Sequence, residues 1–418
     1  MNFIQNMFSS IMKRTIRSSH SGLEDFGVLQ KDVNKAVRSV MSTTGEVSSS
    51  VYAEHLLDLI ENESDEGFVK FFKELKSNYD IDTRTLIDDV KNYSIDKSDE
   101  NLKKVSQASE PKWFEIFKRL NATSNGTYRL VKLRERIKNL KDKNLLSFDS
   151  SLLTLFKYWF NPSFLVLEKV DWSTPANILE KIIAYEAVHE INSWADLRAR
   201  LAPPDRKCFA FFHPLIPEEP LIFVEVALCK NIPGSINQVI KIERNIINPG
   251  HADTAVFYSI SNCQNGLAGV SFGNFLIKKV AHDLKIEFPH LERFVTLSPV
   301  PGLMRWIEIN YPDLHEKYLN GQINNESFLK KTLLYLTKSN REDGLPNDPV
   351  SRFHLGNGAI LEKINLNADN SKKGVSESLG LMVNYLYDLD VVEKNHELFF
   401  KTKVVQVSHE IELLKKKL

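Results

Sequence analysis

The stretch RFHLGNGAIL, from Arg352 to Leu361, places one histidine between a segment expected to be extended and an Asn357-Gly358 turn. Histidine titrates close to neutral pH, so His354 is a candidate for donating or accepting a proton in a reaction. The chain contains eleven histidines, and an ordinary histidine lies on the surface or satisfies its hydrogen bonds in the core. The residues around His354 therefore leave catalysis and packing both open.

A glycine-rich loop suggests a second kind of chemistry, the binding of a diphosphate. A strand is expected to end near Ser261, the loop carries Gly266, Gly269 and Gly273, and an apolar-periodic helix follows through Leu284. Glycines allow the backbone to approach a ligand, and the free N–H groups at a helix start favour an anion. The loop has neither the Rossmann nor the Walker spacing. It resembles the pyrophosphate loop of the GCN5-related acetyltransferase fold, which holds coenzyme A; a turn needed only for packing is the alternative.

The elements that must position these residues change character near residue 190. From about residue 50 to residue 190 the apolar spacing is helical and predicts a bundle; the residues expected to share one buried stripe are Leu56, Leu57, Ile60, Phe68, Phe71 and Phe72. After LAPPDR, the segments KCFAFF, PLIFVEVAL, DTAVFYSIS and ERFVTLS are rich in Phe, Val, Ile and Thr and predict strands. We therefore expect a helical bundle followed by a mixed sheet with packed helices.

Length and composition limit the class of protein. A chain of 418 residues suits about two or three domains, each able to bury a core. Its 54 basic and 54 acidic side chains balance, which argues against a dedicated nucleic-acid binder. The three cysteines lack metal-ligand spacing and predict buried, reduced thiols of an intracellular protein. Because the charges balance, we expect the partner to be a small molecule or another protein. No apolar run is long enough to span a bilayer, so we expect no membrane span.

Both ends of the chain resemble targeting signals. Residues 1–22 combine apolar residues at helical spacing with basic residues and serines, and no acid precedes Glu24. This composition is typical of a mitochondrial transit peptide, although an ordinary amphipathic helix remains the alternative. The chain ends Lys416, Lys417, Leu418, a relaxed relative of the peroxisomal Ser-Lys-Leu address.

A series of segments in fixed order resembles the malonyl-CoA decarboxylase family. These segments are EAVHEI, EPLIFVEVAL, FYSISNCQNGLAGVSFGNFLIKKV, FPHLERFVTLSPVPG, FHLGNGAIL and GLMVNYLYDL. The resemblance implies an α+β fold: an all-helical N-terminal bundle domain followed by an acetyltransferase-like mixed α/β catalytic domain. Together with the composition of the N-terminus and the change in periodicity near residue 190, this predicts a targeting segment at residues 1–22, a helical domain at 23–190 and a catalytic domain at 191–418.

The resemblance also implies a site. The family's catalytic serine falls on Ser298 in TLSPVPG, and its catalytic histidine falls on His354. Its coenzyme-contacting loop falls on Ala268, Gly269, Val270, Ser271, Phe272, Gly273 and Asn274. Some members carry an acidic residue where this chain has Ser271, which leaves open whether a carboxylate assists. Ser259 and Tyr387 lie in matched segments and either line the site or pack with satisfied hydroxyls.

The implied reaction, malonyl-CoA to acetyl-CoA and carbon dioxide, gives the pair a purpose. Loss of carbon dioxide leaves two electrons on the α-carbon, delocalised onto the thioester oxygen as an enolate. Ser298, biased toward an extended backbone by Pro299, would hydrogen-bond the carbonyl or carboxylate, and His354 would protonate the α-carbon. The thioester itself accepts the charge, so we expect no metal and no cofactor beyond the coenzyme A of the substrate.

Two other functions remain open at this point. A coenzyme A-dependent acyltransferase would use the same loop but needs a base for its acceptor amine, for which the sequence has no distinctive acidic candidate. A catalytically silent scaffold or malonyl-CoA sensor would keep the pocket alone. The resemblance further implies a homo-oligomer assembled through the helical domain, control of malonyl-CoA levels in fatty acid metabolism, and residence in the mitochondrial matrix, peroxisome or cytoplasm.

Overall fold

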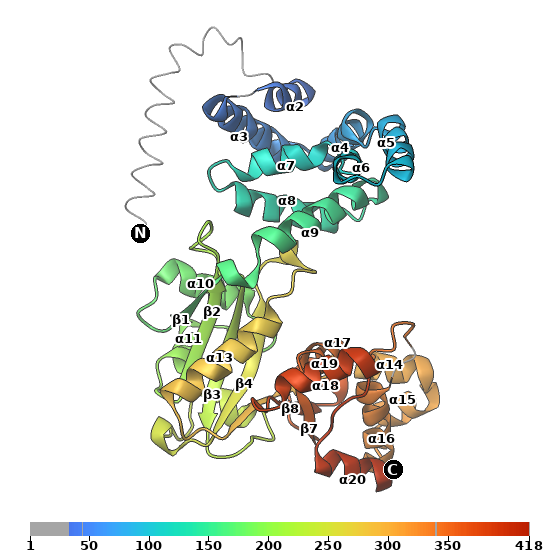
Figure 1. The fold of residues 1–418 in the computed structure, drawn as a ribbon. Helices are drawn as coiled ribbons and strands as arrows, with labels where there is room; N and C mark the ends of the chain where they lie inside the picture. Colours follow the sequence, from blue (N-terminus) through green and yellow to red (C-terminus); the bar gives the residue numbers. More distant parts are fainter. Residues whose placement is uncertain (1–32, 44, 339–340, 418) are drawn as a thin grey trace. The chain divides into compact units, whose positions relative to one another are not determined.

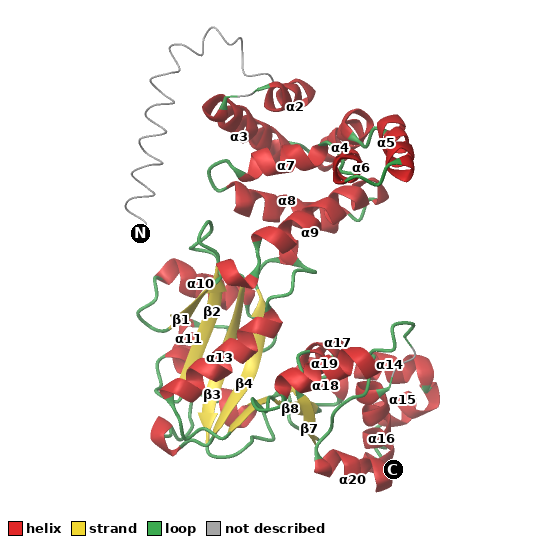
Figure 2. Ribbon diagram, viewed as in Figure 1, coloured by secondary structure: helices red, strands yellow, loops and turns green. Residues whose placement is uncertain are grey.

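The structure is a computed structural model that describes residues 33–43, 45–338 and 341–417. The chain divides into two compact units, shown in Figures 1 and 2. The helical unit consists of the chain up to Phe164 together with two later segments, Pro214–Ile216 and Gln264–Val270. The sheet unit contains the remaining residues from Leu165 onward. The expected boundary at residues 190–191 was therefore wrong, because β1, the first strand of the sheet unit, begins at Val166, directly after Phe164. The targeting segment 1–22 lies outside the described residues.

The helical unit confirms the expected bundle. Its described elements are α2 (Val33–Ser42), α3 (Glu46–Asn62), α4 (Asp65–Tyr79), α5 (Thr83–Ile95), α6 (Asp99–Ala108), α7 (Trp113–Asn121), α8 (Gly126–Leu140), η1 (Lys143–Leu145), α9 (Leu146–Trp159), η2 (Pro162–Phe164) and η4 (Asn265–Leu267). The residues of the expected stripe are all buried, but Ser64 divides them between α3 and α4 by accepting a hydrogen bond from the Gly67 N–H. Phe148 of α9 completes this core, with its ring centroid 4.7 Å from that of Phe72 and 4.6 Å from that of Trp113.

The sheet unit is built on one mixed sheet. Its strands are β1 (Val166–Val170), β2 (Arg206–Phe212), β3 (Ile222–Cys229), β4 (Thr254–Asn262), β5 (Arg293–Thr296), β6 (Ser298–Pro299), β7 (Ile360–Asn365) and β8 (Met382–Leu386). The order is β1-β2-β3-β4-β5-β8-β6, and β7 pairs with β8. All pairs are antiparallel except β4 with β5. The strands expected after LAPPDR are confirmed, whereas β1 lies in a region expected to be helical.

Helices cover both faces of this sheet. The described helices are α10 (Ala176–Tyr185), α11 (Trp194–Leu201), α12 (Asn237–Ile240), η3 (Pro249–His251), α13 (Gly273–Glu287), α14 (Leu303–Asn310), α15 (Pro312–Leu319), α16 (Asn325–Thr337), α17 (Pro349–Gly356), α18 (Lys372–Ser378), α19 (Val392–Thr402) and α20 (His409–Lys417). In β2, Cys208, Ala210 and Phe212 pack in one cluster with α10 and α11. Phe211, which points the other way, stacks on Phe275 of α13. Among the described helices none is long and apolar enough to cross a membrane.

The sheet opens between β4 and β5. Tyr258 is an extra residue in β4, because Val226 of β3 pairs with Phe257 and the adjacent Glu225 pairs with Ser259. Parallel pairing of β4 with β5 ends at Phe257 and Thr296. The chain beyond β5 then pairs with β8 through β6. The last residues of β4 and the start of β6 are thus free to form the walls of a site. The helical bundle followed by a mixed sheet with packed helices agrees with the expected α+β fold class.

Candidate active site

His354 is carried by α17, not by a loop after an extended segment as expected. The Asp348 side chain accepts a hydrogen bond from the Ser351 N–H, and Pro349 occupies the first helical turn. The helix ends before Gly358, whose φ of 88° suits glycine. The Asn-Gly pair therefore marks the end of a helix. The missed signal was Asp-Pro, which starts helices as readily as it starts turns.

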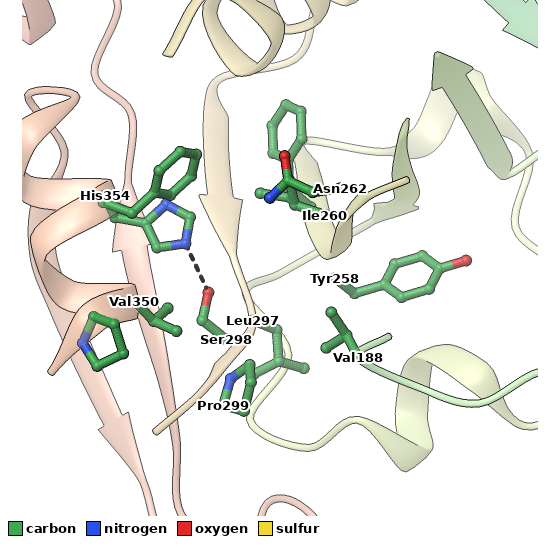
Figure 3. A pocket seen from close by; sticks show the side chains of 12 residues that line it. Val188, Tyr258, Ile260, Asn262, Leu297, Ser298, Pro299, Val350 and His354 are labelled. Carbon is green, nitrogen blue, oxygen red and sulfur yellow. Dashed lines mark hydrogen bonds between the residues drawn. The ribbon is translucent and has the colours of Figure 1, made fainter. Parts of the chain in front are cut away.

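The structure brings together Ser298, His354 and Tyr387 (Figure 3 shows the first two). Ser298 Oγ lies 3.2 Å from His354 Nε2, and the Tyr387 hydroxyl lies 2.8 Å from His354 Nδ1. The Tyr385 ring stacks on the imidazole with centroids 4.7 Å apart. All four side chains are buried. Residues from β6, α17, β8 and the chain after β8 therefore fix both nitrogens and one face of the histidine.

Burial decides the charge of this group. The pKa of His354 is lowered from 6.5 to about 3 because the buried ring loses the hydration of its charged form. Burial likewise raises the pKa of the Tyr387 hydroxyl. At neutral pH the imidazole is therefore neutral and the phenol keeps its proton.

A cavity of about 280 Å³ opens beside the pair. It is lined by Val188, Phe257, Tyr258, Ile260, Asn262, Leu297, Ser298, Pro299, Pro349, Val350, Phe353 and His354. Figure 3 shows Ser298 and His354 on one side of this cavity and Val188 on the other. None of the described residues that line it is Asp, Glu, Lys or Arg. The site is a small, mostly apolar cavity with a few polar groups, which is typical of a small-molecule site.

The first part of the coenzyme loop expected from the family belongs to the helical unit. Arg134 of α8 donates to the carbonyl oxygens of Gly266 and Ala268, at 2.6 and 2.9 Å. A Cβ at Gly266 would come within 2.0 Å of the Val131 carbonyl oxygen, so packing requires this glycine. Gly269 has φ of 90°, and Ala268 and Val270 belong to the same segment.

The second part of the expected loop belongs to the sheet unit. Ser271 is exposed, Phe272 is buried, and Gly273 begins α13. A Cβ at Gly273 would come within 2.5 Å of the Phe353 ring, which lines the cavity. Asn274 is in the first turn of α13; its side chain is outside the described residues. Gly266 and Gly273 therefore have a packing reason to be glycine, whatever else the loop binds.

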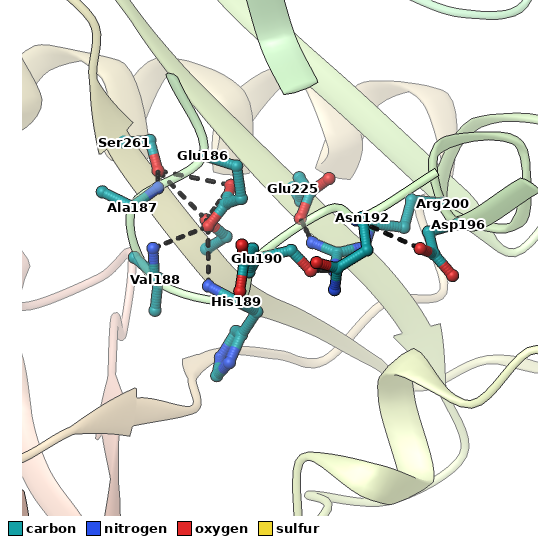
Figure 4. A network of polar contacts seen from close by, with 11 residues as sticks. Glu186, Ala187, Val188, His189, Glu190, Asn192, Asp196, Arg200, Glu225 and Ser261 are labelled. Carbon is teal, nitrogen blue, oxygen red and sulfur yellow. Dashed lines mark hydrogen bonds and ion pairs between the residues drawn. The ribbon is translucent and has the colours of Figure 1, made fainter. Parts of the chain in front are cut away.

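Ser259 does not line the cavity. Its hydroxyl donates to both carboxylate oxygens of Glu186, at 2.8 and 2.7 Å, and Glu186 also accepts the N–H groups of Val188 and His189 at 2.8 Å each. Figure 4 shows this carboxylate at the centre of the turn. Glu186 thus holds Val188 in the cavity wall, a role that sequence reasoning missed although Glu186 opens the segment EAVHEI.

A buried ion pair holds the other end of the same turn. Arg200 Nη1 lies 3.0 Å from Glu225 Oε2, and its Nη2 donates to the Glu190 carbonyl oxygen at 3.1 Å, as Figure 4 shows. Burial raises the pKa of Glu225 to about 7, against the opposing effect of Arg200. His189, judged structural from the sequence, is buried with its pKa lowered to about 4 by desolvation.

Comparison with known proteins settles the family. The family Malonyl-CoA decarboxylase C-terminal domain matches residues 163–330 and 315–418, and the corresponding N-terminal domain matches residues 79–160. The rat protein Malonyl-CoA decarboxylase, mitochondrial is 32% identical over 353 residues, covering 72% of this chain and 70% of that protein. The chain belongs to the malonyl-CoA decarboxylase family. Its division at Phe164 agrees with the division between the two family domains.

Solved structures of malonyl-CoA decarboxylases have the same fold over nearly their whole length. The Agrobacterium vitis structure superimposes with a TM-score of 0.86 at 41% identity, covering 92% of this chain and 99% of that one. The Rhodopseudomonas palustris structure superimposes with a TM-score of 0.80 at 40% identity, covering 91% of this chain and 98% of that one. In the described part of this chain, no group of three His, Cys, Asp or Glu side chains is arranged to hold a metal ion.

Proposed function

We propose that this malonyl-CoA decarboxylase family enzyme converts malonyl-CoA to acetyl-CoA and carbon dioxide, with Ser298 and His354 acting on the reacting acyl group. Family membership supports the reaction, and the site geometry supports the residues. The observation that carries the assignment is the pair itself: a hydroxyl and an imidazole 3.2 Å apart that together border an uncharged acyl-sized cavity.

The cavity favours loss of the carboxylate. The bond between the α-carbon and the carboxylate carbon breaks, carbon dioxide leaves, and the electron pair becomes an enolate on the thioester. The carboxylate charge would face no cationic side chain among the described lining residues, so its disappearance relieves a poorly solvated charge. Ser298 can turn its hydroxyl to the thioester oxygen, where such a donor contributes about 3–4 kcal/mol to the transition state.

His354 then supplies the proton. By itself the ring is neutral, because burial lowers its pKa to about 3. A substrate carboxylate beside the ring opposes this effect and raises the pKa, since a negative charge favours the imidazolium. We expect the ring to gain a proton when the substrate binds and to deliver one to the α-carbon from Nε2. Overall, malonyl-CoA and one proton give acetyl-CoA and carbon dioxide.

The coenzyme portion is proposed to contact residues 268–274, as the family resemblance implies. The exposed Ser271 and the first turn of α13, which begins at Gly273, provide backbone N–H groups suited to a phosphate. Neither Ser271 nor any described cavity residue supplies a carboxylate. The site therefore has no carboxylate base for the amine acceptor of an acyltransferase.

The direct test is product analysis with malonyl-CoA carrying a labelled carboxyl carbon. Equal amounts of labelled carbon dioxide and acetyl-CoA should form, at a rate that a chelator leaves unchanged. An acylated amine would identify an acyltransferase, and unchanged malonyl-CoA in stoichiometric complex would identify a sensor; either result contradicts the proposal. Loss of activity on chelation, restored by a metal ion, would contradict the metal-free mechanism.

The biological setting is proposed from the relatives. The rat and goose relatives are both named mitochondrial, and we propose the same compartment here, with control of malonyl-CoA levels in fatty acid metabolism as the consequence. The peroxisomal and cytoplasmic locations and the homo-oligomer stay predictions.

A further inference from the structure

Thr296 lies directly behind the catalytic pair. It ends β5, is fully buried, and precedes Ser298 by two residues, so the two side chains lie on the same side of the extended chain. Its Oγ1 accepts a hydrogen bond from the Ser298 hydroxyl at 2.9 Å and another from the Tyr385 N–H at 3.1 Å. Its carbonyl oxygen accepts from the Asn384 side chain at 2.8 Å. Backbone and side chain of Thr296 are therefore both held in place.

These contacts determine where the hydrogens lie. A backbone N–H can only donate, so one lone pair of Thr296 Oγ1 is committed to Tyr385. A serine hydroxyl has one hydrogen, and that of Ser298 is given to Thr296. Toward His354 Nε2, 3.2 Å away, Ser298 can then present only a lone pair. The nitrogen that faces Ser298 must accordingly carry the hydrogen of the ring.

The other nitrogen completes the chain. A neutral imidazole carries one hydrogen, so Nδ1 is then an acceptor, and the Tyr387 hydroxyl lies 2.8 Å from it. The hydrogen bonds run in one direction, from Tyr387 to His354 to Ser298 to Thr296. Reversing this chain would let Ser298 donate to Nε2, which is how a histidine activates a serine nucleophile.

We infer that Thr296 is a positioning residue that sets the direction of this chain, and that it thereby selects decarboxylation over cleavage of the thioester. In the free enzyme Thr296 holds the Ser298 hydrogen away from His354 Nε2, and when the substrate binds the hydroxyl can turn to the thioester oxygen. Because the hydrogen is directed to Nε2 in neither state, Ser298 is a hydrogen-bonding group and a poor nucleophile. The inference rests on the proposed function for its substrate, whereas the direction of the chain is a property of the protein alone.

Without the threonine hydroxyl a second reaction becomes accessible. Ser298 Oγ would attack the thioester carbonyl, His354 would take the serine proton and pass it to the departing coenzyme A thiolate, and an acyl-Ser298 would form. Water would then hydrolyse this ester and release the free acid. The reaction needs no oxidant or reductant. It releases coenzyme A as a free thiol and forms no acetyl-CoA, which distinguishes it from decarboxylation.

The first measurement is the tautomer of His354 in the wild-type protein, from NMR of the ¹⁵N-histidine-labelled full chain, with His354→Asn to assign the signal. The hydrogen should lie on Nε2. In Thr296→Val it should move to Nδ1, and Thr296→Ser, which keeps the hydroxyl, should restore it to Nε2. A wild-type hydrogen on Nδ1 overturns the inference without any Thr296 variant having to fold.

The second measurement is the ratio of free coenzyme A to acetyl-CoA formed from malonyl-CoA. In Thr296→Val, kcat for decarboxylation should fall about tenfold, as for loss of one hydrogen bond of ordinary strength, with KM little changed and the ratio clearly raised. Adding Ser298→Ala should abolish the extra thiol. Thr332→Val removes another fully buried threonine hydroxyl, on α16, and should change neither ratio nor tautomer.

The outcomes separate the two hypotheses. A folded Thr296→Val with the parent ratio and the parent tautomer refutes the role of Thr296. A wild-type protein that forms no carbon dioxide refutes the proposed function, while the tautomer still reports whether the chain of hydrogen bonds runs as inferred.

Discussion

His354 is the residue on which the proposed proton transfer depends. His354→Asn keeps a polar side chain of similar reach but removes the group that can gain and lose a proton. We expect turnover of malonyl-CoA to fall by roughly 10²–10⁴-fold, the range of general acid–base catalysis, with little change in substrate affinity. Steady-state kinetics and a thermal melt of the same preparation check this. A folded variant with the parent rate would remove His354 as the acid and leave Tyr387 as the next candidate.

Ser298→Ala supplies the matching half of this prediction. It should also lower turnover, and the double variant should lose much less than the product of the two single losses, because the side chains act as a unit. Multiplicative losses would instead mean that Ser298 and His354 contribute independently.

Single residues were predictable where a matched motif carried them, and not otherwise. Ser298 and His354, the pair that the family resemblance implies, lie 3.2 Å apart. Tyr387 and Ser259 were left open between lining the site and packing: the Tyr387 hydroxyl contacts His354 Nδ1, and Ser259 bonds Glu186. Thr296 was missed because its role depends on the Tyr385 N–H, which comes from a distant strand. The spacing of two residues from Ser298 along a strand was the available signal.

Helix α17 carries a group that should make stability depend on pH. Burial raises the pKa of Asp348, its N-cap, from 3.8 to about 7, so the folded protein keeps this proton where the unfolded chain has released it. The stabilising contribution is complete below about pH 4 and is lost as pH rises through about 7. Asp348→Asn keeps the cap but cannot ionise. Relative to wild type, its melting temperature should therefore rise between pH 5 and pH 8.

Two other groups show that this direction of the pH dependence of stability is specific to Asp348. The pKa of His354 is lowered from 6.5 to about 3 by burial, so its contribution is complete above about pH 6.5 and is lost as pH falls. Hydrogen bonding to Arg341 lowers the pKa of the exposed Asp343 to about 2, and Asp343→Asn should not gain stability at pH 8. If Asp348→Asn shows no relative gain at high pH, the buried carboxylate is not destabilising.

Elements with strong periodicity were predictable, and short ones were not. The long helices of the bundle and the strands β2 to β5 follow from their apolar patterns. The strand β1 has largely exposed residues and therefore lacks an apolar pattern. The eight-residue α17 is too short for periodicity to show, so only its Asp-Pro start could have revealed it.

At the scale of the whole molecule, the units do not follow the sequence in two simple blocks. The change in periodicity near residue 190 placed the domain boundary later than the change in packing, which comes at Phe164. The helical unit contains Gln264–Val270 from the middle of the chain. Contacts between residues so distant in sequence have no local signature, which is why this segment could not be assigned in advance.

Arg134 is expected to hold that segment. Its side chain is 2% exposed and lies 2.9 Å from Asp149, while its Nη1 donates to the carbonyl oxygens of Gly266 and Ala268. Arg134→Met would leave these acceptors unpaired, at about 1–3 kcal/mol for each buried group. In the full chain, hydrogen exchange in residues 264–270 should accelerate and the melting temperature should fall.

Arg129→Met provides the matched control. Arg129 lies on the same helix, α8, and binds Asp58 and Glu61 of α3, at 2.6 and 2.7 Å, so its loss weakens the bundle without removing the carbonyl contacts that Arg134 makes. Exchange in residues 264–270 should stay near the parent rate in Arg129→Met and rise in Arg134→Met. Equal acceleration in both would mean that the segment depends on the stability of the bundle as a whole, and not on the two carbonyl contacts of Arg134.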